Sequence, residues 1–150
     1  MRSLIEQINS KNWWHSLPEV RAAYKKRGIF LSSSYSECEF YGHPLDEPVK
    51  VRLSNPLIDT EENVIVTLFG EGSAQMGAYK TLVNNTAKNL KTRFSLDREM
   101  YLSAKKNGYD AIAIVTDKGI RKIKEENKLP RSIELNIFDI KKSSLRDKNA

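Results

Sequence analysis

Residues 133–138 read Ile133-Glu134-Leu135-Asn136-Ile137-Phe138 and carry the clearest strand signal of the chain. Apolar and polar side chains alternate along them, as they do on a strand that is buried on one side. The alternation places Glu134, Asn136 and Phe138 on one face of the strand and the intervening aliphatic residues on the other. We therefore expect Glu134 to point into a cleft and not into the core.

Three other segments predict strands that could join this one. Residues 111–115 are short, apolar and rich in β-branched side chains, and residues 29–31 form an apolar run that ends in Ser32-Ser33-Ser34. Residues 49–53 alternate apolar and basic side chains and end before Asn55-Pro56. Each of these segments is short enough to be one strand of a common sheet.

Apolar residues at helical spacing predict helices at residues 3–9, at about 79–91 and at 95–107, the last beginning at Ser95 as its N-cap. Residues 64–69 fit a strand or a helix, and residues 118–128 fit a loop or a surface helix. Strands and helices do not alternate regularly. The sequence therefore predicts an α+β fold with a mixed, mainly antiparallel split sheet and flanking helices.

Two serines have the spacing of a helix N-cap with a glutamate three residues later. Ser16 precedes Glu19 and predicts a helix that runs to Gly28. Ser34 precedes Glu37 and predicts a two-turn helix over 35–41. Its last residue, Tyr41, could be a plain core residue on the same side as Cys38.

The length of 150 residues and the hydrophobic content of 39% suit one continuous core, so we expect a single domain over 1–150 with a frayed tail at 143–150. The chain lacks a signal-like N-terminus and an apolar run of about 20 residues, which predicts a cytoplasmic protein with no membrane partner. One cysteine and two histidines favour neither a disulfide nor a metal site.

The formal net charge is +6, with a pI near 9.4, which permits attraction to a polyanion. Nucleic acid is therefore a possible partner. No helix-turn-helix, RNP-type or zinc signature accompanies the charge, so this interpretation rests on charge alone.

Three segments, in this order, resemble the small ADP-ribosyltransferase-like domains of bacterial toxins and phage effectors. The first is 28–34 followed by 38–42, which is similar to that family's strand, serine/threonine-rich loop and helix with the pattern small residue-x-x-Tyr-Gly. The second is 49–58, ending in Asn-Pro-Leu-Ile, and the third is 104–112, followed by a closing strand at 133–140. Together they cover most of the chain from His15 onward.

The resemblance implies an enzyme that uses NAD as a substrate and transfers ADP-ribose to a macromolecule of a host cell, most simply a protein. It implies a catalytic glutamate on a late strand, for which Glu134 is the first candidate and Asp139 the second. It also implies a His or Arg that contacts the NAD ribose, for which His15 is the candidate and Arg21 the alternative. The implied cofactor-binding residues are completed by a group of hydroxyl-bearing side chains: Ser32, Ser33, Ser34, Tyr35 and Tyr41.

These residue types fit the chemistry, because a carboxylate stabilises an oxocarbenium-like state and an aromatic ring stacks on nicotinamide. The family's Gly-Thr pair is missing after His15, however. A second interpretation therefore stays open, in which the chain is a basic binding protein that keeps the fold, has lost the chemistry and blocks a host protein or nucleic acid.

Overall fold

A computed structural model of the protein describes residues 2–17, 29–34, 43–44, 48–84 and 90–138. Six strands lie in this part of the chain: β1 (Trp14–Leu17), β2 (Ile29–Ser32), β3 (His43–Pro44), β4 (Pro56–Asp59), β5 (Ala111–Ile114) and β6 (Glu134–Ile137). Five helices accompany them: α1 (Leu4–Ser10), α3 (Glu61–Phe69), α4 (Ala74–Asn84), α5 (Leu90–Lys106) and α6 (Asp117–Glu126).

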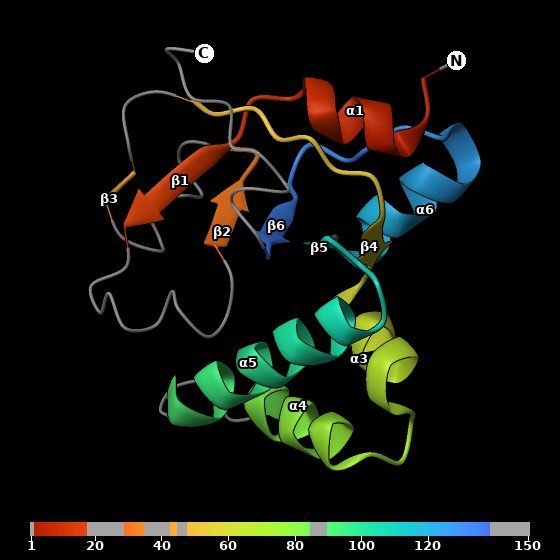
Figure 1. Cartoon of the computed structure of the whole chain (residues 1–150). Helices are drawn as coiled ribbons and strands as arrows, with labels where there is room; N and C mark the ends of the chain where they lie inside the picture. The colour runs from red at the N-terminus through yellow and green to blue at the C-terminus, as the bar shows by residue number, and fades with distance from the viewer. Residues whose placement is uncertain (1, 18–28, 35–42, 45–47, 85–89, 139–150) are drawn as a thin grey trace.

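The strands form one sheet in the order β3-β1-β2-β6-β5-β4 (Figure 1). Strands β4 and β5 pair in parallel, and all other neighbours in this order pair antiparallel. Strand β6, which carries the alternating sequence, lies between β2 and β5. The α+β class and the mixed, mainly antiparallel sheet are therefore confirmed.

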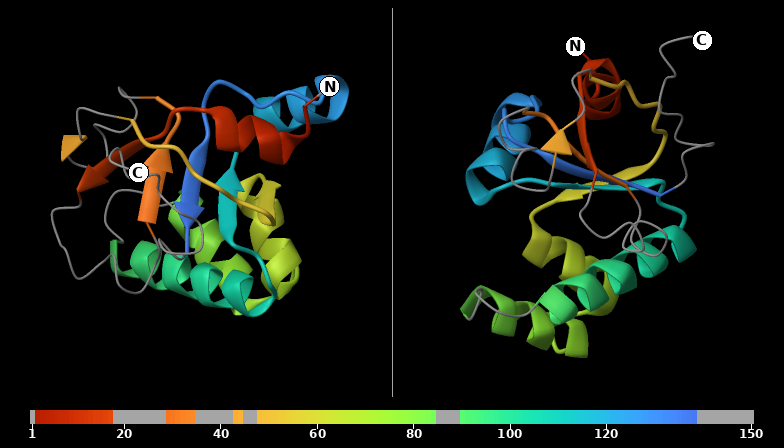
Figure 2. Two further views of the ribbon diagram at one scale, coloured as in Figure 1. Left: turned by 45° about the horizontal axis from the view of Figure 1, so that its top comes forward. Right: turned by 90° about the vertical axis from the view of Figure 1, so that its left-hand side faces the viewer.

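Helices cover both faces of the sheet, as the edge-on view of Figure 2 shows. Helices α1 and α6 lie over one face, called here the α1/α6 face, and helices α3, α4 and α5 lie over the other, called the α5 face. Each layer encloses its own apolar cluster. Leu135 and Ile137 of β6 are buried on the α1/α6 face, and Phe138 is buried on the α5 face. The predicted alternation is confirmed, but the second face of β6 is covered by helices as well.

Helix α1 is attached to the α1/α6 face by side-chain hydrogen bonds to the backbone. The indole Nε1 of the fully buried Trp13 donates to the carbonyl of Ile8 over 2.9 Å. The carboxamide of Asn9 accepts from the amide of Leu53 at 2.8 Å and donates to its carbonyl at 3.0 Å. The two bonds to Leu53 satisfy backbone groups of residues 50–53, a segment that is not itself in the sheet.

Residues 50–53 do not form the strand that their alternation predicts. Val51 and Leu53 are buried and Arg52 is exposed, so the one-sided burial is present, but only Val49 pairs, in an isolated bridge with Trp13. The next strand of the sheet is β4, which begins after this segment, at Pro56. The carboxylate of Asp110 accepts from the amides of Ser54 and Asn55 at 2.7 and 3.1 Å, and this turn aligns β4 with β5.

Helix boundaries also differ from the prediction. Helix α5 begins at Leu90, so Ser95 lies inside it on an exposed face and does not cap it. Ser16 lies in strand β1 and so does not cap a helix at residue 17, and the rest of the helix predicted to run to Gly28 lies outside the described residues. Residues 64–69, which fitted a strand or a helix, lie in helix α3, and residues 118–126 of the segment 118–128 lie in helix α6. Each helix has a threonine N-cap, Thr60 for α3 and Thr116 for α6.

Candidate active site

Glu134 is the first residue of β6 and lies in the middle of the sheet. Its Cα is paired with Ser32 of β2 on one side and with Ile114 of β5 on the other. Directly opposite residues of antiparallel strands share a face, so the three side chains project towards the α5 face. Glu134 is partly exposed there, whereas Ser32 is buried, with 3% of its surface accessible.

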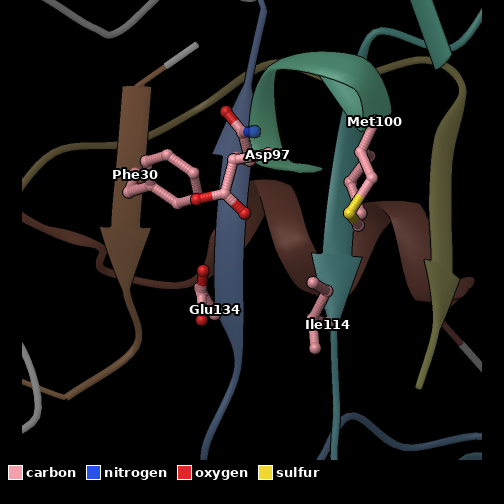
Figure 3. A pocket seen from close by; sticks show the side chains of 7 residues that line it. Phe30, Asp97, Met100, Ile114 and Glu134 are labelled. Carbon is pink, nitrogen blue, oxygen red and sulfur yellow. The ribbon is translucent and has the colours of Figure 1, made fainter. Parts of the chain in front are cut away.

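A hollow that is partly open to solvent lies between helix α5 and the sheet at this point. Among the described residues, its polar lining is formed by Asp97, Glu134 and Asn136, and its apolar lining by Phe30, Met100, Ile112 and Ile114. Figure 3 shows Asp97 and Glu134 entering it from different elements, with Phe30 to one side and Met100 and Ile114 to the other. The enclosed space is about 10 Å³, room for about one water molecule, so the hollow is a shallow depression and not a preformed ligand pocket.

Asp97 reaches the hollow from helix α5 and is 9% exposed. Its Oδ1 accepts from Nε and Nη2 of Arg93, at 2.9 and 2.5 Å, and Nη1 of the same guanidinium lies 2.5 Å from Oε1 of Glu61. Burial alone would lower the pKa of Arg93, but the charges of Asp97 and Glu61 outweigh it and hold that pKa above its ordinary value. The guanidinium is therefore permanently charged.

Of the predicted serines, Ser32 lies in the row of Glu134 and Ser33 bonds to the backbone. Ser32 shares the face and the row of Glu134, and its Oγ accepts from the amide of Ser34 at 3.2 Å. The hydroxyl of Ser33 is engaged on both sides: it donates to the carbonyl of Arg131 at 2.8 Å and accepts from the amide of Ile133 at 2.9 Å. Ser33 thus fixes the chain just before β6, and only Ser32 is placed beside Glu134.

His15 does not share this face. Its Cα is paired with Leu31, which is buried on the α1/α6 face, so the imidazole projects away from Glu134. Burial lowers the pKa of His15 and favours its neutral form. The neighbouring residue Trp14 is paired with Ser32 and so lies in the row of Glu134. The structure therefore separates His15 from the first catalytic candidate and brings Trp14 to it instead.

The other predicted residues, Asp139, Tyr35, Tyr41 and Arg21, lie outside the described residues. Asp110 has a structural role, because its carboxylate accepts hydrogen bonds from the amides of Ser54 and Asn55 and from the hydroxyl of Ser54. Within the described ranges, no group of three His, Cys, Asp or Glu side chains is placed to hold a metal ion. Helices long and apolar enough to cross a bilayer are likewise absent from the part that was described.

Comparison with protein-family models, with curated protein sequences and with solved structures finds no match. The chemistry of the hollow must therefore be argued from its own residues.

Sequence reasoning missed the helical wall of this site, above all Asp97. A signal was present, because Leu96, Met100 and Ala104 repeat at helical spacing and mark the buried side of α5, and Asp97 is next to that stripe. Arg93, four residues earlier, is placed to pair with it. Nothing in the sequence indicates that this side of the helix faces Glu134.

Proposed function

We propose that the protein is an NAD-dependent mono-ADP-ribosyltransferase with the fold of that family, and that it modifies a macromolecule of a host cell. The observation that carries the proposal is the position of Glu134, whose strand pairs with that of Ser32 at a hollow lined by Phe30 and Asn136. The reaction needs a carboxylate beside the ribose and an apolar surface for the nicotinamide ring. The position of Glu134 beside Ser32 supports the first requirement, and the neighbouring side chain of Phe30 supports the second.

In this reaction the bond between ribose C1′ and the nicotinamide nitrogen breaks, and its electron pair passes to the ring, which leaves as neutral nicotinamide. The acceptor forms a new bond to C1′ and releases a proton. Positive charge develops on the ribose between these events. The carboxylate of Glu134 stabilises that charge and accepts a hydrogen bond from a ribose hydroxyl.

The remaining groups would orient the substrate. Phe30 and the aliphatic side chains Ile112 and Ile114 offer flat apolar contacts to the nicotinamide ring. The carboxamide of Asn136, which is 5% exposed, lines the hollow next to Phe30. Ser32 completes the row beside Glu134. The hollow is too small to enclose a ring, so NAD would lie across the surface beside Glu134.

One observation favours the second candidate function, an inactive basic protein that binds and blocks a host component. His15, which the resemblance places at the NAD ribose, lies on the α1/α6 face, opposite Glu134. A protein that has lost this contact could keep the fold without the chemistry. The net charge of +6 would then serve binding to an acidic protein or a nucleic acid.

The test is transfer of label from NAD, labelled in its adenosine part, to a host-cell lysate by the purified protein. Glu134→Gln keeps the shape of the side chain and removes its charge, so we expect transfer to fall at least about 100-fold, as when one transition-state contact is removed. Glu99→Gln is the matched control, because Glu99 is exposed on helix α5 and the change of charge is the same.

Protease or nuclease treatment of the labelled material then identifies the acceptor as protein or nucleic acid. Label that survives in the Glu134→Gln variant would contradict the assignment of the catalytic residue. No label in any lysate, together with no NAD binding by calorimetry, would reject the enzyme in favour of the binding protein.

A further inference from the structure

Positive charge is concentrated on the α1/α6 face of the sheet. Residues 2–12, 48–53 and 117–131, which hold helices α1 and α6, carry ten Lys or Arg and four Asp or Glu side chains. Residues 56–84 and 90–110, which hold β4 and helices α3, α4 and α5, carry six basic and seven acidic ones. In the described part of the chain, the basic excess therefore lies on the side of the sheet opposite to Glu134.

Four cations of this face gather at the C-terminal end of helix α1. Nη1 of Arg2 donates to Oγ of Ser10 over 3.0 Å, and Nζ of Lys50 donates to the carbonyl of Ser10 over 2.5 Å. Lys11 follows directly in sequence, and the charge of Lys122 on helix α6 reaches its ammonium group. We call Arg2, Lys11, Lys50 and Lys122 the basic cluster.

Hydrogen bonds fix the two helices that carry this cluster. The carboxamide of Gln7 donates to the carbonyl of Asn127 at 2.7 Å and accepts from the amide of Leu129 at 2.9 Å. Helix α1 is thereby attached to the segment that follows α6, and Figure 2 shows the two helices on the same side of the sheet. The backbones of Lys11 and Lys122 are therefore held in place relative to each other.

Acidic side chains do not neutralise the basic cluster. The ion pairs within the described ranges join Arg93 to Glu61 and Asp97, and none of them includes a member of the cluster. Burial and the charge of Lys122 both lower the pKa of Lys11, so both disfavour its charged form. The charge of Lys11 thus does not stabilise the fold, whereas a bound anion would offset the repulsion from Lys122.

The surroundings of the cluster indicate which polyanion it fits. The large apolar side chains that are exposed in the described residues, Val83, Phe94 and Leu102, all lie on helices α4 and α5. The described part of the α1/α6 face thus lacks the apolar centre of a protein interface and the aromatic rings on which single-stranded bases stack. Ile120 and Ile123 of α6 pack against the core and are not free to enter a membrane. A duplex, in contrast, presents phosphates that bind through charge and hydrogen bonds.

We infer that the α1/α6 face binds the phosphate backbone of double-stranded DNA through the basic cluster, without reading the base sequence. Ammonium and guanidinium groups only donate hydrogen bonds, and phosphate oxygens only accept them. The inference goes beyond the proposed function and does not depend on it, because the cluster and Glu134 lie on opposite sides of the sheet. It assigns a position and a partner to the positive charge of the chain.

The salt dependence of DNA binding tests this inference. The full chain would be titrated into a fluorescein-labelled duplex of roughly 20 base pairs, from about 50 to 200 mM salt, and binding followed by fluorescence anisotropy. Contacts from three or four cations give a slope of roughly −3 to −4 for the logarithm of the binding constant against that of the salt concentration. A duplex of scrambled sequence should bind equally well.

Two double variants with the same change of net charge separate the cluster from charge in general. Lys11→Gln with Lys122→Gln should reduce the size of the slope by about 2 and weaken binding at the lowest salt at least about tenfold. Lys80→Gln with Lys106→Gln, both exposed on helices α4 and α5, should keep the slope. Circular dichroism checks folding. If the first double variant does not fold, Lys122→Gln alone, at an exposed position, should reduce the slope by about 1.

Several outcomes would overturn the inference. They are an unchanged slope in the Lys11/Lys122 variant, an equal loss in the Lys80/Lys106 variant, and absence of duplex binding at about 50 mM salt. Tighter binding of polyglutamate of equal charge would instead assign the surface to an acidic protein, and tighter binding of oligothymidylate would assign it to single strands. Either result would reject the duplex as the partner.

Discussion

Replacement of Arg93 by methionine should destabilise the protein substantially. The change keeps much of the apolar stem and removes the cation between Asp97 and Glu61, whose side chains are 11% and 20% exposed. Removal of one partner of a buried ion pair costs about 3–5 kcal/mol. Solvent screens the Arg93 side chain, which is 31% exposed, so we expect the lower end, about 3 kcal/mol. That corresponds to a fall in Tm of roughly 6–12 °C for a domain of this size.

Urea denaturation followed by circular dichroism measures this loss. The control is Arg98→Met on the same helix, where the arginine is exposed, with an expected change within about 0.5 kcal/mol. The pKa of Arg93 is raised on folding, so its stabilisation is complete below its unfolded pKa, which lies far above neutral pH, and is lost only as the pH rises through its folded pKa. The loss should thus be equal at pH 6 and pH 9. A loss below about 1 kcal/mol, or an equal loss in Arg98→Met, would refute the reasoning.

Four further substitutions should alter the free energy of unfolding or its pH dependence, measured in the same way. Gly119→Ala should lower it by about 1–3 kcal/mol, since the added Cβ would lie 2.9 Å from Cγ of Pro130, whereas Gly77→Ala, in open space on a helix, should raise it by about 0.5–1 kcal/mol. Ser33→Ala removes both hydrogen bonds that fix the start of β6 and should cost about 1–3 kcal/mol; a neutral outcome would leave Ser33 without this structural role. Burial lowers the pKa of His15, so the wild type should lose stability as the pH falls below about 6.5, and His15→Gln should lose less.

The strand that carries Glu134 could be predicted because apolar and polar side chains alternate along residues 133–137. Leu135 and Ile137 are buried on the predicted face, and Glu134 lies on the other. Residues 49–53 alternate equally clearly. Val51 and Leu53 are buried as this alternation predicts, but residues 50–53 do not form a strand. Alternation reports one-sided burial, whereas a strand also needs a neighbour, and the sequence does not indicate which neighbours exist.

The face of His15 could not be predicted, since two tryptophans precede it and either could be the buried one. Trp13 is fully buried on the α1/α6 face, which puts His15 there as well and Trp14 opposite. The position of Asp97 beside Glu134 could not be predicted for a related reason. The position of helix α5 over the sheet depends on its packing with α3 and α4, and one helix's sequence does not specify that packing.

The pairing of β2 with β6 has a consequence for the order of folding. Ser33 and Ile133, which hydrogen-bond beside this pair, are 100 residues apart in sequence. Closing so long a loop is slow, because its entropy is lost before any contact forms. The hollow is lined by Phe30 of β2 and by Glu134 of β6, which lie at the two ends of that loop. A chain in which the α3, α4 and α5 helices have already packed would therefore still lack the site, which forms only when β2 pairs with β6.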